Sequence, residues 1–108
     1  MYKRQILLSE VPPLRAGVPR ALADSVREAL LNVEKHARAR SVVVTVSSHR
    51  GGVLVVVADD GVGIPAAGVG GHGLGLEAIR DRLARLGGGV LIDANEDGGA
   101  TVRLWVPC

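Results

Sequence analysis

Residues 59–76 read DDGVGIPAAGVGGHGLGL, and seven of the fifteen glycines in the chain lie within this one stretch. Because glycine has no Cβ, it tolerates backbone conformations and close approaches that other residues do not. The concentration of glycine therefore predicts a segment that needs unusual backbone or lets another group come close. The residues on both sides have the ordinary periodicities of helices and strands.

The residues before this stretch predict a helix followed by a hairpin. Two β-branched runs, residues 42–47 and 53–59, are joined by His49-Arg50-Gly51-Gly52 and are typical of antiparallel strands. Residues 19–38 predict a helix that begins with a proline, which suits the first turn, and residues 6–8 predict a short edge strand. The apolar stripe of the predicted helix consists of Leu22, Val26, Ala29, Leu30, Val33 and Ala37.

The residues after the glycine-rich stretch predict a second helix and a second pair of strands. Gly87 stands where a left-handed helix cap is expected, and residues 89–94 and 100–106 predict strands that flank a reversing turn. Helices separated by hairpins of apolar strands indicate an α+β fold. We expect a two-layer α/β sandwich in which helices cover one face of a mixed, mostly antiparallel sheet. The core positions of the second helix are Leu76, Ile79, Leu83 and Leu86.

The composition indicates one small globular domain. The 108 residues include 13 lysines and arginines against 11 aspartates and glutamates, with 47% hydrophobic and 22% charged residues. These totals fit neither a disordered chain nor a membrane-spanning one. The basic residues form short helical clusters, so we expect no nucleic-acid binding, and the apolar runs are too short for membrane contact. The single Cys108 favours a reducing, cytoplasmic location.

The first five residues are considered apart from the fold. Tyr2-Lys3-Arg4-Gln5 resembles the peptide encoded by a common transposon-derived sequencing adapter. Residues 1–5 are therefore either native or a non-native leader. Residues 6–108 are expected to form the single domain.

A polar stripe runs along the predicted first helix. Its members at i, i+4, i+7 and i+8 are Glu28, Asn32, Lys35 and His36. Oxygen and nitrogen groups on one such face could hold a hydrated Mg²⁺ and its phosphates, because Mg²⁺ prefers oxygen ligands and keeps several waters. A solvated helix face with ordinary intrahelical pairs would have the same pattern.

The glycine-rich stretch offers two further binding features. Asp59 follows an apolar strand and could accept a hydrogen bond from a buried exocyclic amine, although an ordinary Asp-Gly turn would explain it too. Gly71-His72-Gly73-Leu74-Gly75-Leu76 opens the second helix, where free amides and the helix dipole attract phosphate. The chain contains no P-loop, no Gly-x-Ser-x-Gly elbow and no His-Glu-x-x-His zinc motif.

These blocks occur in the order found in one ATPase superfamily. Residues 27–37 resemble the N box, Asp59-x-Gly61-x-Gly63 the G1 box, and residues 71–76 the G2 box of the GHKL superfamily. With residues 80–88, the chain is most similar to the catalytic (HATPase_c) domain of nitrate-sensor-like bacterial sensor histidine kinases. The resemblance covers residues 14–107 and implies the Bergerat-type ATP-binding fold with ATP and Mg²⁺ as cofactors.

The resemblance implies roles for the matching residues. Asn32 would bind Mg²⁺, Asp59 would accept from the adenine amino group, and residues 64–72 would form the ATP lid. The resemblance implies both a catalytic and a metal-linked role for Glu28 and for Asn32. Glu28 is included because its counterpart in the ATPase branches of the superfamily activates water. The implied nucleotide-binding residues are Asn32, Lys35, His36, Asp59, Gly61, Gly63, Gly71, His72, Gly73, Leu74, Gly75, Leu76 and Thr101.

One departure from the family pattern concerns the last strand. The family commonly has threonine straight after the glycine of that strand, whereas this chain has Ala100 there and Thr101 one position later. Because one step along a strand turns the side chain to the opposite face, Thr101 is a questionable substitute.

The function that this resemblance implies is the catalytic domain of a two-component sensor histidine kinase. It would present Mg·ATP to a histidine on a separate phosphoacceptor helical domain, which this fragment lacks, and alone it would not autophosphorylate. The full-length kinase would be a homodimer and would act on a response regulator. This domain would be cytoplasmic, either in a soluble kinase or as the cytosolic part of a membrane-bound one. The alternatives are a stand-alone GHKL ATPase, an anti-sigma-type serine kinase and a pseudokinase interaction module.

Overall fold

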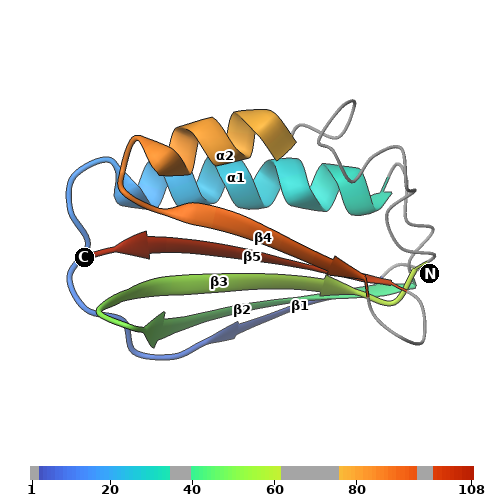
Figure 1. The fold of residues 1–108 in the computed structure, drawn as a ribbon. Coiled ribbons are helices and arrows are strands. Elements are labelled where there is room, and N and C mark those ends of the chain that lie inside the picture. Colours follow the sequence, from blue (N-terminus) through green and yellow to red (C-terminus); the bar gives the residue numbers. More distant parts are fainter. Residues whose placement is uncertain (1–2, 35–39, 62–75, 95–98) are drawn as a thin grey trace.

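The computed structural model is a five-stranded sheet with two helices packed on one of its faces (Figure 1). It describes residues 3–34, 40–61, 76–94 and 99–108. Among these residues, no helix is both long and apolar enough to span a bilayer. The elements are β1 (Lys3–Leu8), α1 (Val18–Asn32), β2 (Ser41–His49), β3 (Gly52–Asp59), α2 (Leu76–Ala84), β4 (Gly89–Ala94) and β5 (Ala100–Pro107).

The sheet has the strand order β1-β2-β3-β5-β4. β1 pairs with β2 in parallel, whereas the other three pairs are antiparallel. The predicted α+β class, with a mixed and mostly antiparallel sheet under two helices, is therefore confirmed. β1 is longer than the predicted strand at residues 6–8, since Lys3 already pairs with Ser41. Whether residues 1–5 are native stays a prediction.

The β2–β3 hairpin is tighter than the sequence predicted. The ladder continues to the pair His49–Gly52, so that only Arg50 and Gly51 form the turn. Both turn residues have positive φ, 48° and 72°. Two-residue turns with this backbone match the right-handed twist of the strands, which lets the pairing run to the end of the hairpin.

The two helices end differently. α1 is α-helical only to Asn32 and continues as a π-type turn at residues 33–34, and residues 35–38 of the predicted helix lie outside the described residues. α2 ends as predicted at Gly87, whose φ is 81°. The N–H groups of Gly87 and Gly88 donate to the carbonyls of Ala84 and Leu83, the two bonds of a Schellman cap.

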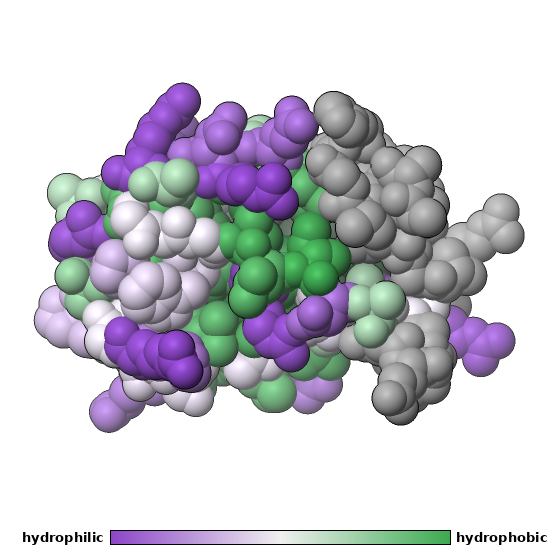
Figure 2. All heavy atoms as spheres, viewed as in Figure 1, coloured by the Kyte–Doolittle hydropathy of each residue, from purple (hydrophilic) through white to green (hydrophobic). Residues whose placement is uncertain are grey.

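The core lies between the sheet and the helices. Alternate residues of β2, β3 and β5 point toward the helices and are buried, as expected for an antiparallel sheet with one covered face. From the helix side, Ile79 and Leu83 are 0% exposed. On the face drawn in Figure 2, apolar side chains are visible between the helix layer and β4.

The chain brings four element ends to one end of the sandwich. The C-terminal ends of α1 and β3 lie there together with the N-terminal ends of α2 and β5 (Figure 1). All the sequence motifs for ligand binding are attached to these four ends. The fold therefore places segments that are far apart in the sequence around one region.

Candidate functional site

The described part of the chain contains six of the predicted site residues. They are Glu28, Asn32, Asp59, Gly61, Leu76 and Thr101. The others lie outside the described residues, so their predicted roles stay predictions: Lys35, His36, Gly63, Gly71, His72, Gly73, Leu74 and Gly75.

Asp59 is a buried carboxylate at the end of β3. Its side chain lies on the helix-facing side of the sheet, and the residue is only 9% exposed. The Gly61 N–H donates to Asp59 Oδ1 at 2.9 Å, and the Ala100 N–H also hydrogen-bonds to this carboxylate. An ionised carboxylate has about four acceptor positions. Asp59 can therefore accept a hydrogen bond from a ligand in addition to those from the backbone.

Burial raises the pKa of Asp59 above its ordinary value, although the backbone hydrogen bonds from Gly61 and Ala100 oppose the shift. The neighbouring charge of Asp60 raises it further. Loss of hydration disfavours the charged form of an acid, and here this effect is the largest. Folding therefore places a charge-bearing group in an unfavourable environment at neutral pH, which is typical of functional positions.

Asp60 has a different, structural role that the sequence did not reveal. Its Oδ1 accepts from the N–H groups of Arg40 and Ser41 at 2.8 and 2.9 Å, and its Oδ2 accepts from Ser41 Oγ at 3.0 Å. The hydrogen bond from the Ser41 N–H is the main cause that lowers the pKa of Asp60. Its stabilising effect is thus present above the ordinary aspartate pKa and is lost as the pH falls through the lowered value. The one sequence feature that could have predicted this contact is the polar Ser41 at the start of the apolar strand β2.

Glu28 faces α2 and does not lie on a purely solvated helix face. Glu28 Oε1 accepts from Arg82 Nη2 at 2.6 Å, and Arg82 Nη1 donates to Ser25 Oγ at 3.1 Å. Ser25 is 0% exposed. Since Ser25, Glu28 and Asn32 follow one another at helical spacing, this side of α1 forms the seam with α2.

The residues on this seam fit a magnesium site only in part. Asn32 carries an amide oxygen of the kind that Mg²⁺ accepts in its ligand shell. Glu28 already binds a guanidinium, which competes with a cation for the same oxygen. The described residues contain no group of three or more His, Cys, Asp or Glu side chains that could hold a metal on their own. A site here would depend on ligand oxygens.

The start of β5 packs directly against the end of β3. Gly99 has a φ of 83°, and a Cβ built on it would lie 2.1 Å from the Asp59 carbonyl oxygen. Only glycine fits this position, because the conflicting atoms belong to the backbone. Gly99 thereby fixes the distance between Asp59 and the Ala100 N–H that hydrogen-bonds to it.

Two predicted nucleotide-binding residues, Leu76 and Thr101, have side chains that lie in the hydrophobic core and on the sheet face opposite Asp59, respectively. Leu76 is 2% exposed and belongs to the hydrophobic core, so its side chain fixes the start of α2 and a ligand contact could come only from its backbone. Thr101 pairs with Ala58 and Asp93, and strand alternation turns its side chain to the face opposite Asp59 and Ala100. The sheet geometry therefore does not bring Thr101 to the Asp59 side chain.

Comparison with known proteins agrees with this geometry. Residues 17–108 match the family described as "Histidine kinase-, DNA gyrase B-, and HSP90-like ATPase". The chain belongs to this family. The ATPase-family domain is 38% identical over 76 residues to the nitrate/nitrite sensor protein NarX of Escherichia coli, covering 70% of this chain and 13% of NarX. It is 35% identical over 97 residues to the sensor histidine kinase MctS of Rhizobium johnstonii, covering 87% of this chain and 21% of MctS.

The solved structure of another ATP-binding domain superposes well on the ATPase-family domain. The ATP-binding domain of PrrB from Mycobacterium tuberculosis is 29% identical with a TM-score of 0.76, covering 95% of this chain and 79% of that one. The ATP-binding domain of PrrB thus has the fold observed here. The chain spans only 13 to 21% of the length of the two curated relatives.

The raised pKa of Asp59 leads to a pH-dependent prediction for this ATPase-family domain. Between the ordinary aspartate pKa, about 4, and the raised value, the folded state binds its proton more tightly than the unfolded state. The stability attributable to Asp59 therefore increases as the pH falls through this window. We expect Asp59→Asn to have the higher free energy of unfolding at pH 7 and to lose this advantage toward pH 4.

Urea denaturation of both proteins at a series of pH values measures this difference. Asp81→Asn is the control, because Asp81 is an exposed acid on α2. A stability difference between Asp59→Asn and the parent that stays constant from pH 7 to pH 4 would contradict the prediction.

Proposed function

We propose that this chain is the catalytic ATP-binding domain of a two-component sensor histidine kinase. It would hold Mg·ATP so that the γ-phosphate reaches a histidine on a separate phosphoacceptor helical domain. The observation that carries the proposal is the buried Asp59 carboxylate, held by backbone N–H groups where the Asn32-bearing end of α1 and the start of α2 meet. Sensor kinases among the relatives support it.

In this proposal Asp59 recognises adenine. Its carboxylate would accept a hydrogen bond from the exocyclic amine of the base, and Gly61 would let the ring lie against the backbone. Because the carboxylate is already oriented by the Gly61 and Ala100 N–H groups, little ordering would be needed on binding. A charged acceptor also discriminates strongly against a base with a carbonyl oxygen at that position.

The phosphate end of the ligand would lie near the C-terminal end of α1. Asn32 would be the protein ligand of Mg²⁺, which neutralises phosphate charge when bound. Catalysis in such a site consists of positioning and charge neutralisation. The residues proposed to contact phosphate or close over it are Lys35, His36, Gly63, Gly71, His72, Gly73, Leu74 and Gly75.

The wider context of the domain is part of the same proposal. The phosphoacceptor domain would belong to the same kinase, the kinase would be a homodimer, and a cytoplasmic response regulator would receive the phosphoryl group. Residues 6–108 would form the single catalytic domain, and residues 3–5, native or not, extend β1 alongside β2. Without the phosphoacceptor domain, this chain would bind nucleotide and phosphorylate no histidine.

Asn32→Ala tests the metal-linked part of the site. We expect Mg²⁺ to strengthen ATP binding by the parent, and the variant to lose at least about tenfold in affinity, or about 1.4 kcal/mol, in the presence of Mg²⁺. Without Mg²⁺, the two proteins should bind ATP much more equally. Calorimetric titration with ATP, with and without Mg²⁺, measures both effects.

The matched control is Leu31→Ala, which truncates an exposed side chain at the neighbouring helix position. Equal Mg²⁺-dependent affinities for the parent and Asn32→Ala would refute the assignment of Asn32. Steady ATP hydrolysis by the parent at a rate typical of an ATPase would instead favour the stand-alone ATPase.

A further inference from the structure

Arg82 links the two helices beside the proposed ATP site. One guanidinium nitrogen donates to Glu28 Oε1 at 2.6 Å and another donates to Ser25 Oγ at 3.1 Å. The two acceptors lie one turn apart on α1, so the guanidinium fork is held at two points. Arginine suits such an arrangement because its donors have a fixed planar geometry.

This ion pair is better protected from solvent than the pairs Arg20–Asp24 and Arg103–Asp93. The side chains of Arg82 and Glu28 are 27% and 28% exposed, and the third member, Ser25, is completely buried. The pair Arg20–Asp24 on α1, by contrast, has a separation of 3.9 Å and exposures of 89% and 46%. Exposed pairs contribute little and exchange freely. Arg82 therefore restrains Glu28 more firmly than an ordinary surface partner would.

The carboxylate that Arg82 restrains, Glu28, lies close in sequence to the proposed phosphate-binding end of α1. Glu28 precedes Asn32 by one helical turn, on the same side of α1. If Asn32 lies at the phosphate end of the ligand, a carboxylate one turn away could take a proton from water that attacks the γ-phosphate. General bases of this kind contribute typically about 10²- to 10⁴-fold in rate. Because Arg82 is also tethered to Ser25, it holds Glu28 Oε1 toward α2, and the carboxylate is not free to turn toward that water.

We propose that Arg82 is a positioning residue that keeps Glu28 from activating water and so protects bound ATP from hydrolysis. The inference rests on the proposed function. In the suppressed reaction, the water oxygen forms a bond to the γ-phosphorus while the bond from phosphorus to the bridging oxygen of ADP breaks. The proton of the water passes to the Glu28 carboxylate, and ADP leaves with the electron pair of the broken bond. Suppression keeps the γ-phosphoryl group for a protein acceptor.

The test compares phosphate release by the isolated domain and its variants. Arg82→Met, which keeps the apolar stem and removes the guanidinium, is expected to raise ATP hydrolysis at least about tenfold. Adding Glu28→Gln to Arg82→Met should return the rate to the parent level. Arg82→Lys, which retains a cation beside Glu28, should stay closer to the parent than Arg82→Met.

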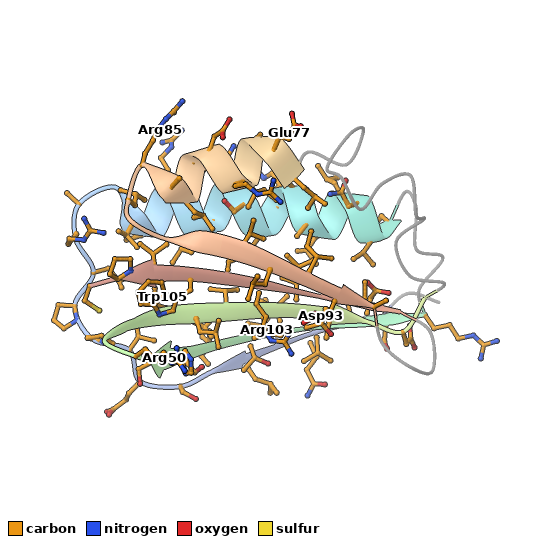
Figure 3. The ribbon with its side chains drawn as sticks, viewed as in Figure 1. Arg50, Glu77, Arg85, Asp93, Arg103 and Trp105 are labelled. Carbon is orange, nitrogen blue, oxygen red and sulfur yellow. The ribbon has the colours of Figure 1, made fainter. Side chains whose placement is uncertain are left out.

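Arg85→Met is the matched control, because Arg85 directly follows the last residue of α2 and its side chain points away from the molecule (Figure 3). It should leave the rate unchanged. A second readout is independent of turnover: in NMR spectra of the ligand-free domain, rotation of the Arg82 guanidinium should be slow in the parent and fast in Glu28→Gln. Thermal unfolding and ATP affinity are measured for every variant.

The outcomes separate this inference from the proposed function. If the parent does not bind ATP, both are wrong. If Arg82→Met folds and binds ATP but hydrolyses it at the parent rate, Arg82 is only a structural link and the inference is overturned. A rise that persists in the double variant with Glu28→Gln overturns it as well. If Arg82→Met fails to fold, Ser25→Ala replaces it as the test. This variant loosens the Arg82 guanidinium and should raise the rate of ATP hydrolysis by less than Arg82→Met would. An unchanged rate in Ser25→Ala overturns the inference.

Discussion

Asp59→Asn is expected to remove most of the ATP affinity of the domain without weakening its fold at pH 7. The asparagine keeps the shape of the side chain, and its carbonyl oxygen can still accept the hydrogen bond from Gly61. The other end of the amide would then present N–H groups to the adenine amine, which are donors facing a donor. Loss of a charged hydrogen bond costs about 1.5–3 kcal/mol, so we expect a decrease in affinity of about 10- to 150-fold.

Calorimetric titration with ATP measures the affinity, and thermal unfolding of the ligand-free protein measures stability. Asp81→Asn, the same chemical change on an exposed position of α2, should bind like the parent. The assignment of Asp59 to adenine would be refuted by a variant that is folded and binds ATP as tightly as the parent. A variant that loses both fold and binding would show that Asp59 is mainly structural.

Gly99→Ala is expected to have the largest effect on stability. A Cβ at this position would meet the Asp59 carbonyl oxygen at 2.1 Å and the Asp60 Cα at 3.1 Å, and the backbone is left-handed with a φ of 83°. Left-handed backbone costs a residue with a side chain about 1–2 kcal/mol, and overpacking typically adds about 1–3 kcal/mol. Relief would require β5 to move away from the end of β3. We therefore expect a loss of about 2–5 kcal/mol in the free energy of unfolding, together with weaker ATP binding.

Gly51→Ala separates the two contributions. Gly51 has a similar φ of 72°, but nothing lies within 4 Å of a Cβ built there, so only the backbone cost of about 1–2 kcal/mol applies. Urea denaturation of both variants gives the comparison. Equal losses for Gly99→Ala and Gly51→Ala would mean that the contact with Asp59 is relieved at no cost, and ATP binding should then be unaffected.

The elements of the fold could be predicted because their signals are local. The spacing of Leu76, Ile79 and Leu83 predicts a helix with one buried face, and all three residues are buried there. Gly87 ends this helix as expected, because a left-handed cap depends on a single residue. The hairpin was predicted with its turn too long, since the extent of a ladder depends on pairing across strands.

The candidate site could be predicted only as a set of motifs. Asp59 was identified from its place after an apolar strand, yet the role of its neighbour Asp60 depends on Ser41, which lies on another strand. Leu76 belongs to the last motif by sequence, but packing decides that its side chain enters the core. Strand alternation predicts that Thr101 faces the side opposite to Ala100, and the sheet register shows that this side is also opposite to the Asp59 side chain.

By itself, the sequence determined the order of helices and strands, the buried faces of the two helices, and which motifs flank the glycine-rich stretch. These properties follow from periodicity and from backbone preferences of single residues, which act over a few positions. Only the tertiary structure decided that Arg82 meets Glu28 across 54 positions of sequence and that Gly99 lies against Asp59. Such contacts depend on how whole elements pack, and many polar pairings are compatible with one hydrophobic pattern.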